Sequence, residues 1–80
     1  MAPKRRIVRD WRDLGLALRD LRVLRGLSQK ALAQLLGRNQ AGICHTETAQ
    51  SYPHLSVIAR WAALCGYQLR IVFEKKGVKA

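Results

Sequence analysis

Residues 28–46, SQKALAQLLGRNQAGICHT, predict two short helices joined by a glycine turn. Ser28 is a good N-cap for the first helix, residues 29–36, because its hydroxyl can accept a hydrogen bond from a free backbone N–H group of the first turn. The apolar residues of this helix share one face: Leu32, Leu35 and Leu36. Gly37 suits the end of a helix, since it adopts a left-handed conformation at no steric cost, so a sharp turn is predicted there.

The second helix of this pair, residues 40–46, is mostly polar. Asn39 precedes it as N-cap, and Ile43 is its only large aliphatic residue. A helix with a single apolar anchor must lie at the surface. A simple corner between two helices of a bundle would explain the apolar positions, but it would not explain why the second helix is polar.

Two further helices are predicted on either side of this pair. The first begins after the N-cap Asp10 and ends at Gly26. The residues of one face recur at intervals of three and four: Trp11, Leu14, Leu18, Leu21, and Leu24 or Arg25. The other begins at Pro53, which suits a first helical turn, and runs to about Leu64 before Gly66. Its apolar face holds Leu55, Ile58, Ala62 and Cys65. The predicted fold class is therefore mostly α, with four to five helices around one small core.

After Gly66 the apolar residues no longer recur at helical spacing but at every second position, which predicts a β-strand over residues 67–75. Tyr67, Leu69, Ile71 and Phe73 alternate with Gln68, Arg70, Val72 and Glu74. Because a lone strand leaves its backbone groups unpaired, antiparallel pairing of residues 69–73 with a second copy is the simplest arrangement. Leu69, Ile71, Val72 and Phe73 would then form the dimer contact. The alternative is an extended tail that folds back on its own helices.

Four segments follow from these patterns. Residues 1–9 are basic and show no sustained period, so they are predicted to form a flexible arm. Residues 10–66 form the helical domain, residues 67–75 the dimerisation strand, and residues 76–80 a tail.

The charge of the chain favours nucleic acid as a partner. Fifteen Lys and Arg against five Asp and Glu give the 80 residues a net charge of +10. An anionic membrane suits the sequence less, because the basic residues recur along the whole chain rather than on one face of a helix. No apolar run approaches the roughly 20 residues of a membrane-spanning helix, and the chain starts without the apolar core of a signal peptide. We therefore expect a cytoplasmic protein.

Catalysis and metal binding are not expected. Cys44 and Cys65 are the only cysteines, and a single pair in a basic intracellular chain is expected to be reduced and free of metal. Cys44 and His45 are a tempting catalytic pair, but neighbouring helical residues do not face each other and no acid is placed to orient the imidazole. We expect no catalytic residues, no metal and no cofactor.

The pattern resembles the phage repressor and Cro family of helix-turn-helix regulators, also called the XRE type, without gaps from about Arg22 to Gly66. The matching residues are Leu27-Ser28-Gln29, Leu32-Ala33, Leu36-Gly37, Gln40, Ile43, Glu47, Pro53, Leu55 and Leu64-Cys65-Gly66. The resemblance implies a lambda-repressor-like fold. It also implies a bacterial or phage-encoded homodimer that binds a near-palindromic operator in double-stranded DNA and regulates transcription as a repressor.

The resemblance implies that the helix at residues 40–46 enters the major groove of DNA. The residues that would contact bases are Gln40, Ala41, Cys44 and His45. A Gln40 amide can donate and accept in the pattern that adenine presents, and an Ala41 methyl can contact a thymine methyl. For Cys44 and His45 the alternatives stay open, because the first could simply fill space and the second could be an ordinary exposed imidazole.

Phosphate contacts would surround this helix. The resemblance implies that Gln29 contacts a phosphate. The positive end of the helix dipole lies at that position and favours an anion. Further candidates lie in the turn, in the following loop and in the basic arm: Arg38, Asn39, Gln50, Tyr52, Lys4, Arg5 and Arg6. The arm residues could instead be merely solvated.

Other positions are structural or depart from the family. The resemblance implies a shielded ion pair between Arg22 and Glu47. Arg38 stands at a turn position that is usually aliphatic, Thr46 replaces a larger apolar residue, and Ala49 stands where Gly often takes a left-handed conformation. A second function also fits a helix-turn-helix followed by a strand, namely an antitoxin that represses its own operon and binds a protein toxin. A neighbouring toxin gene would favour that alternative.

Overall fold

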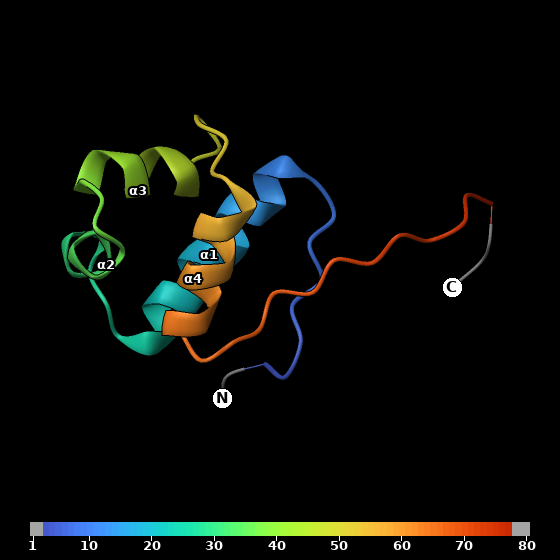
Figure 1. The fold of residues 1–80 in the computed structure, drawn as a ribbon, viewed down its shortest axis with the longest axis horizontal. Coiled ribbons are helices and arrows are strands. Elements are labelled where there is room, and N and C mark those ends of the chain that lie inside the picture. Colours follow the sequence, from blue (N-terminus) through green and yellow to red (C-terminus); the bar gives the residue numbers. More distant parts are fainter. Residues whose placement is uncertain (1–2, 78–80) are drawn as a thin grey trace.

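The structure is a computed structural model that describes residues 3–77. These residues contain four helices and no β-strand, so the mostly α prediction is confirmed and the strand is not formed in this chain alone. Figure 1 shows their order along the chain. The helices are α1 (Trp11–Arg25), α2 (Gln29–Leu36), α3 (Gln40–Glu47) and α4 (Leu55–Leu64).

The first three helices begin at side-chain caps. The Asp10, Ser28 and Asn39 side chains each accept a hydrogen bond from a backbone N–H group of the first turn, at 2.8, 3.0 and 2.8 Å. Helix α4 differs, because it begins at Leu55 rather than at the predicted Pro53. His54 is still extended, and its carbonyl accepts the first bonds of the helix from the Val57 and Ile58 N–H groups.

The core lies between α1, α2 and α4, with one residue of α3 added to it. Trp61 is its largest side chain and is fully buried, and its indole N–H donates to the Leu18 carbonyl at 3.0 Å. The other members of the core include Leu21, Leu32, Ala33, Leu36, Ile43, Ile58, Ala62 and Cys65. Sequence analysis did not single out Trp61, although it lies three residues after Ile58 on the same helical face.

Three leucines assigned to apolar faces by their spacing are exposed instead. Leu24, Leu35 and Leu55 each expose half or more of their surface. Leu24 and Leu55 lie near the ends of their helices, where fewer residues can cover them. Leu35 lies at the edge of the helical face that Leu32 and Leu36 share. A core this small covers only the centre of each apolar face.

Helix α1 approaches the end of α3 through a glycine. A Cβ atom on Gly15 would lie 2.7 Å from the Glu47 carbonyl oxygen and 2.8 Å from that of Thr46. Because both neighbours are backbone atoms, no side chain can replace Gly15 without moving one helix. Sequence analysis missed this close contact between two segments far apart in the chain.

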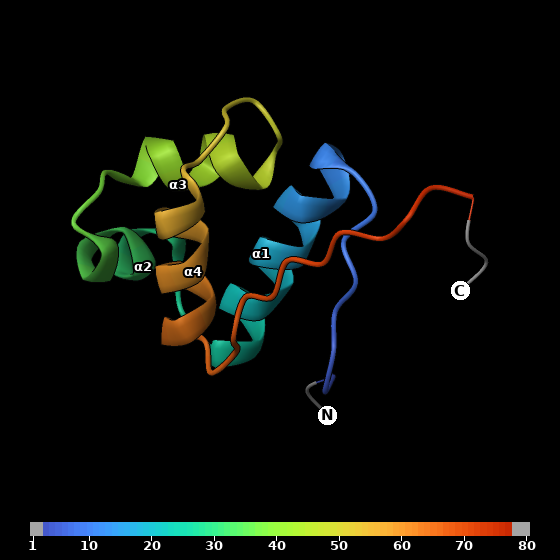
Figure 2. The same ribbon diagram turned by 45° about the vertical axis from the view of Figure 1, so that its right-hand side comes forward.

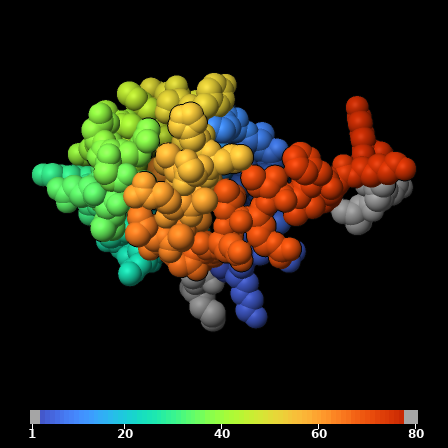
Figure 3. All heavy atoms as spheres, in the orientation of Figure 1, coloured from blue at the N-terminus to red at the C-terminus, as the bar shows by residue number. Residues whose placement is uncertain are grey.

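The segment after α4 leaves the body of the protein. Tyr67 and Leu69 pack against the core, whereas Ile71, Val72 and Phe73 are exposed. The segment crosses beside the N-terminal arm and then projects away (Figures 1–3). After Tyr67, no backbone hydrogen bond joins it to the rest of residues 3–77. Only its first residues therefore fold back on the helices.

The N-terminal arm is held in place within residues 3–9. The Arg6 guanidinium pairs with the Asp13 carboxylate at 2.6 Å, and the Arg9 N–H donates to the same carboxylate at 3.0 Å. These two contacts hold the pKa of Asp13 below its ordinary value. The Tyr67 hydroxyl donates to the Pro3 carbonyl at 2.6 Å. These contacts join the arm to α1 and to the C-terminal segment, and the flexibility of the arm stays a prediction. Residues 1–2 of the arm and 78–80 of the predicted tail lie outside the described residues.

Candidate nucleic-acid interface

The turn between α2 and α3 begins at a glycine in the left-handed conformation. Gly37 has a φ of 68°, the left-handed conformation predicted for it. The Arg38 N–H then donates to the Ala33 carbonyl at 2.9 Å, which closes the end of α2. Ile43 is buried among the leucines of α2, so one apolar side chain attaches α3 to the scaffold.

The outer face of α3 is free of packing contacts at most of the positions predicted to contact bases. Gln40, Ala41 and His45 are exposed, whereas Cys44 is half-buried. Thr46 is buried, and its hydroxyl donates to the Gly42 carbonyl at 2.9 Å. This bond explains how a polar residue occupies a position that is apolar in the family.

Three side chains connect α1, α2 and α3. The Arg22 guanidinium donates to both carboxylate oxygens of Glu47, at 2.6 and 3.0 Å, and also to the Leu27 carbonyl at 2.8 Å. The side chain of Glu47 is only 2% exposed. The Gln29 amide nitrogen donates to Glu47 as well, at 3.1 Å. The Arg22–Glu47 pair implied by the resemblance is therefore formed, and it also orients Gln29, a partner that sequence analysis did not foresee.

Four further phosphate candidates lie at the two ends of α3. Arg38 and Asn39 are exposed in the turn before the helix, and Gln50 and Tyr52 are exposed in the loop after it. The Asn39 carboxamide oxygen caps α3, which leaves its NH₂ group free for another acceptor. The turn and the loop flank α3 along one edge of the molecule (Figures 1 and 2).

The loop after α3 contains Ala49, one of the three departures from the pattern of the resembled family. Ala49 has a φ of 60°, the left-handed conformation in which the family often uses glycine. The Gln50 N–H donates to the His45 carbonyl at 2.7 Å and so closes the helix. Further along the loop, the ring of Tyr52 packs on Trp11 of α1, a contact that no sequence pattern indicated.

The basic arm lies apart from α3. It runs along α1 from a point beside the end of α4, where Pro3 meets Tyr67, up to the start of α1 (Figure 1). Lys4 and Arg5 are exposed, whereas Arg6 is engaged by Asp13. The structure does not bring these residues together with the other candidates, so their contact with DNA stays a prediction.

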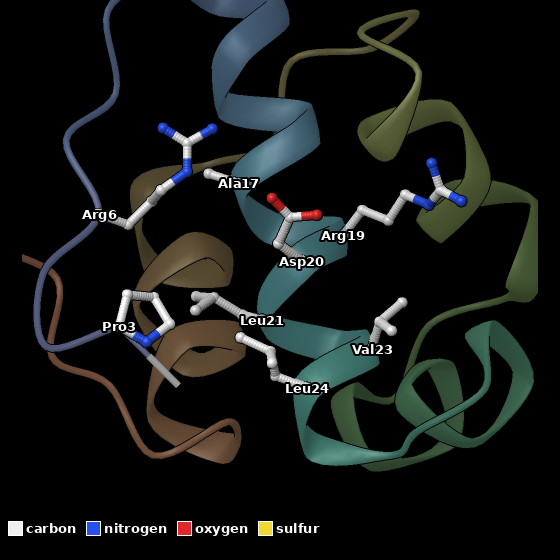
Figure 4. A pocket seen from close by; sticks show the side chains of 8 residues that line it. All are labelled: Pro3, Arg6, Ala17, Arg19, Asp20, Leu21, Val23 and Leu24. Atoms are coloured by element: carbon white, nitrogen blue, oxygen red, sulfur yellow. The ribbon is translucent and has the colours of Figure 1, made fainter. Parts of the chain in front are cut away.

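Two hollows of the surface lie against the N-terminal arm and α1. One of them, of about 420 Å³, is bounded by the arm on one side and by α1 on the other (Figure 4). Its lining residues include Pro3, Arg6, Ala17, Asp20, Leu21 and Leu24.

Cys44 lies within α3 and Cys65 lies at the C-terminal end of α4, and both are free thiols. Burial raises the pKa of the Cys65 thiol, so this residue stays protonated inside the core. Within residues 3–77 no helix is long and apolar enough to cross a membrane.

Comparison with known proteins identifies the family. The sequence profile of the helix-turn-helix domain family matches residues 13–70, which is more than half of the chain. No curated protein shows a significant match to the sequence. The matched range contains α2, the turn and α3, together with the helices that hold them. The chain therefore belongs to the helix-turn-helix family of DNA-binding domains.

Proposed function

We propose that this protein is a transcriptional regulator of the phage repressor and Cro type, which binds a near-palindromic operator as a homodimer and represses by occupancy, without catalysis. The exposed outer face of α3 carries the proposal. A polar helix anchored by Ile43 alone, on a chain with a net charge of +10, is suited to the major groove of DNA.

Bases would be read mainly by the exposed side chains of α3. Gln40 lies in the first turn, where it can present its amide to an adenine, and Ala41 beside it can contact a thymine methyl. His45 lies more than one turn later and can reach a second base pair. Cys44 is half-buried, so its share of the contact is smaller.

The phosphate contacts would hold α3 in register. Gln29 lies at the start of α2, and one N–H of its amide is engaged by Glu47. The second N–H remains available for a phosphate oxygen, in the region where the helix dipole also favours an anion. Arg38 and Asn39 before α3, and Gln50 and Tyr52 after it, would contact the backbone on either side.

The exposed C-terminal segment would supply the dimer contact. Antiparallel pairing of residues 69–73 with a second copy places Ile71 on the twofold axis and Phe73 opposite Leu69 of that copy. Phe73 is 96% exposed in the single chain, whereas Leu69 already packs on the core. Pairing would therefore bury Phe73 against the core of the second copy and give the segment its backbone partners. The two α3 helices would then read half-sites about 34 Å apart.

Selection of bound duplexes from a random DNA pool tests the reading of bases. The wild-type protein should enrich one near-palindromic sequence, and Gln40→Ala and His45→Ala should each relax the preference at a different base pair, by about 1 to 3 kcal/mol. Gln29→Ala should weaken binding to every sequence by a similar factor. Binding without sequence preference, or equal losses on every sequence for all three variants, would contradict the proposal.

Sedimentation of the free protein tests the dimer. The wild-type chain should form dimers, whereas Ile71→Asp should be monomeric and bind a single half-site only, because two like charges would meet on the twofold axis. Arg70→Asp, with its side chain on the other face of the segment, is the matched control. A chain that stays monomeric would exclude this dimer, and the exposed segment would then favour the antitoxin alternative, in which it binds a protein toxin.

A further inference from the structure

The protein contains two tryptophans, and their surroundings differ. Trp61 is fully buried and hydrogen-bonded, as expected of a core residue. Trp11 is the first residue of α1, and its indole N–H is buried without a hydrogen-bond partner among residues 3–77. Its ring lies 4.3 Å from that of Tyr52, centroid to centroid, at an angle of 44°. The Trp61 side chain is thus held by a hydrogen bond in the core, whereas the Trp11 side chain contacts the Tyr52 ring.

Tyr52 remains open to solvent in spite of this contact. Its side chain is 80% exposed, so Trp11 covers only part of the ring and leaves most of the side chain accessible. A large aromatic side chain gains little folding energy in this arrangement, because most of its apolar surface stays in water. What the contact does provide is a preferred orientation for a side chain that would otherwise rotate freely on a loop.

Tyr52 belongs to the loop that follows α3. Residues 48–54 follow α3 directly, and Figures 1 and 2 both place this loop at the end of the molecule where α3 and the start of α1 meet. The close approach of Gly15 to the Glu47 carbonyl fixes α1 against the end of α3. The position of Trp11, and with it that of Tyr52, is thus defined relative to α3.

We propose that Trp11 is a positioning residue for DNA binding: its ring holds Tyr52 so that the Tyr52 hydroxyl donates a hydrogen bond to one backbone phosphate next to the C-terminal end of α3. This inference rests on the proposed DNA binding and adds a residue of α1 to it. Ordering the side chain before binding removes an entropic cost that the complex would otherwise bear. Trp11 itself does not contact DNA.

Binding to duplexes that carry a single uncharged methylphosphonate tests this role, with the duplex taken from the random-pool selection. For the wild-type protein, one substituted phosphate beyond the end of α3 should weaken binding about threefold to tenfold through loss of the Tyr52 bond. Tyr52→Phe keeps the ring and removes the hydroxyl, so it should abolish the sensitivity to that phosphate. Trp11→Leu keeps an apolar side chain and removes the aromatic support, and should reduce the same sensitivity while leaving the other phosphates unaffected.

A double-mutant cycle separates positioning from general stability. In the Tyr52→Phe background, Trp11→Leu should cause little further loss of affinity, because its effect acts through the hydroxyl. Trp11→Phe, which retains a ring, should preserve most of the wild-type sensitivity and is the matched control. If Trp11→Leu does not fold, Trp11→Met, which is apolar and not aromatic, is the measured variant and should show the same loss. Thermal unfolding of each variant verifies that the domain is intact at the assay temperature.

Several outcomes would overturn the inference. Equal losses on Trp11→Leu in both backgrounds, or a phosphate profile that Tyr52→Phe leaves unchanged, would show that Trp11 does not act through Tyr52. If the wild-type protein binds no DNA, the proposed function fails together with this inference. If the wild-type protein selects a palindrome but the profile ignores both residues, only the positioning role fails.

Discussion

The α2–α3 unit and the C-terminal segment both expose side chains, but they differ in how many of their hydrogen-bonding groups find partners within one chain. In residues 28–47 the caps, the turn and the Arg22–Glu47 pair give the polar groups partners within the chain. In residues 70–77 the apolar side chains are exposed and the backbone has no partner among residues 3–77. The first region is complete within one chain and has a polar outer face, whereas the second has exposed apolar side chains and unpaired backbone groups among residues 3–77.

The difference lies in the kind of secondary structure. A helix forms its hydrogen bonds within one segment, so α3 is complete with one large apolar side chain, Ile43, in the core and with Thr46 and Glu47 hydrogen-bonded. A strand forms its hydrogen bonds with another strand, and the C-terminal segment finds none in the single chain. The region that is complete alone is suited to bind a different molecule, and the incomplete one is suited to bind a second copy.

The largest effect is expected from breaking the complete region at Glu47. Glu47→Ala leaves the Arg22 guanidinium without its partner in a nearly buried position, and should lower the free energy of unfolding by about 3 kcal/mol. Urea unfolding followed by circular dichroism measures the change. Asp20→Ala, on the exposed side of α1, is the control and should stay within about 0.5 kcal/mol of the wild type. If Glu47→Ala also changes the free energy of unfolding by less than about 0.5 kcal/mol, the pair does not support α3.

The next effect concerns the contact between α1 and α3. Gly15→Ala places a Cβ against two backbone carbonyl oxygens, so it should destabilise the domain by about 2 kcal/mol in spite of the better helix propensity of alanine. Gly42→Ala is the matched substitution in α3, where the added Cβ would meet only a side-chain atom of Asn39, at 3.2 Å. It should leave stability nearly unchanged. Similar thermal unfolding of the two variants would rule out the close approach at Gly15.

A smaller effect, of opposite sign, is expected in the loop after α3. Ala49 has a positive φ, which a residue with a Cβ adopts at a cost, so Ala49→Gly should stabilise the protein by about 0.5 to 1 kcal/mol. Chemical unfolding at neutral pH measures this gain. Ala31→Gly, within α2, should instead lose about 1 kcal/mol. A loss at Ala49 would show that this residue is not left-handed in solution.

The smallest effect is expected at the N-terminal arm, which lies beside the C-terminal segment. Because the pKa of Asp13 is lowered in the folded protein, its contacts stabilise arm docking above the ordinary carboxyl pKa and lose this effect as the pH falls through the lowered value. The amide NMR signals of residues 6–9 should move together in that acidic range. In Asp13→Asn they should lack this transition, and a transition at the ordinary carboxyl pKa in the wild type would exclude the pairing with Arg6.

Sequence patterns predicted the local structure of this protein well. The caps at Asp10, Ser28 and Asn39 depend on neighbouring residues only, and all three are formed. The single anchor Ile43 was identified by the absence of other apolar residues in its helix. The start of α4 was placed two residues early because Pro53 suits a first turn but does not require one.

Contacts between distant segments were harder to predict. The Gly15 contact, the Trp11–Tyr52 pair and the Gln29–Glu47 bond each depend on how two helices or a helix and a loop meet in space. Periodicity does not contain that information. Only the Arg22–Glu47 pair was anticipated, and it came from the family resemblance rather than from spacing.

Amide chemical shifts, measured as the selected DNA duplex is added to the labelled protein, compare the two regions most directly. If α3 reads DNA and the C-terminal segment joins two copies, the large shifts should fall at residues 28–30, 38–45 and 50–52. Residues 69–73 should change little when the protein is already dimeric. Large shifts at residues 69–77 or in the arm, with α3 unaffected, would contradict the assignment of DNA binding to the helix-turn-helix unit.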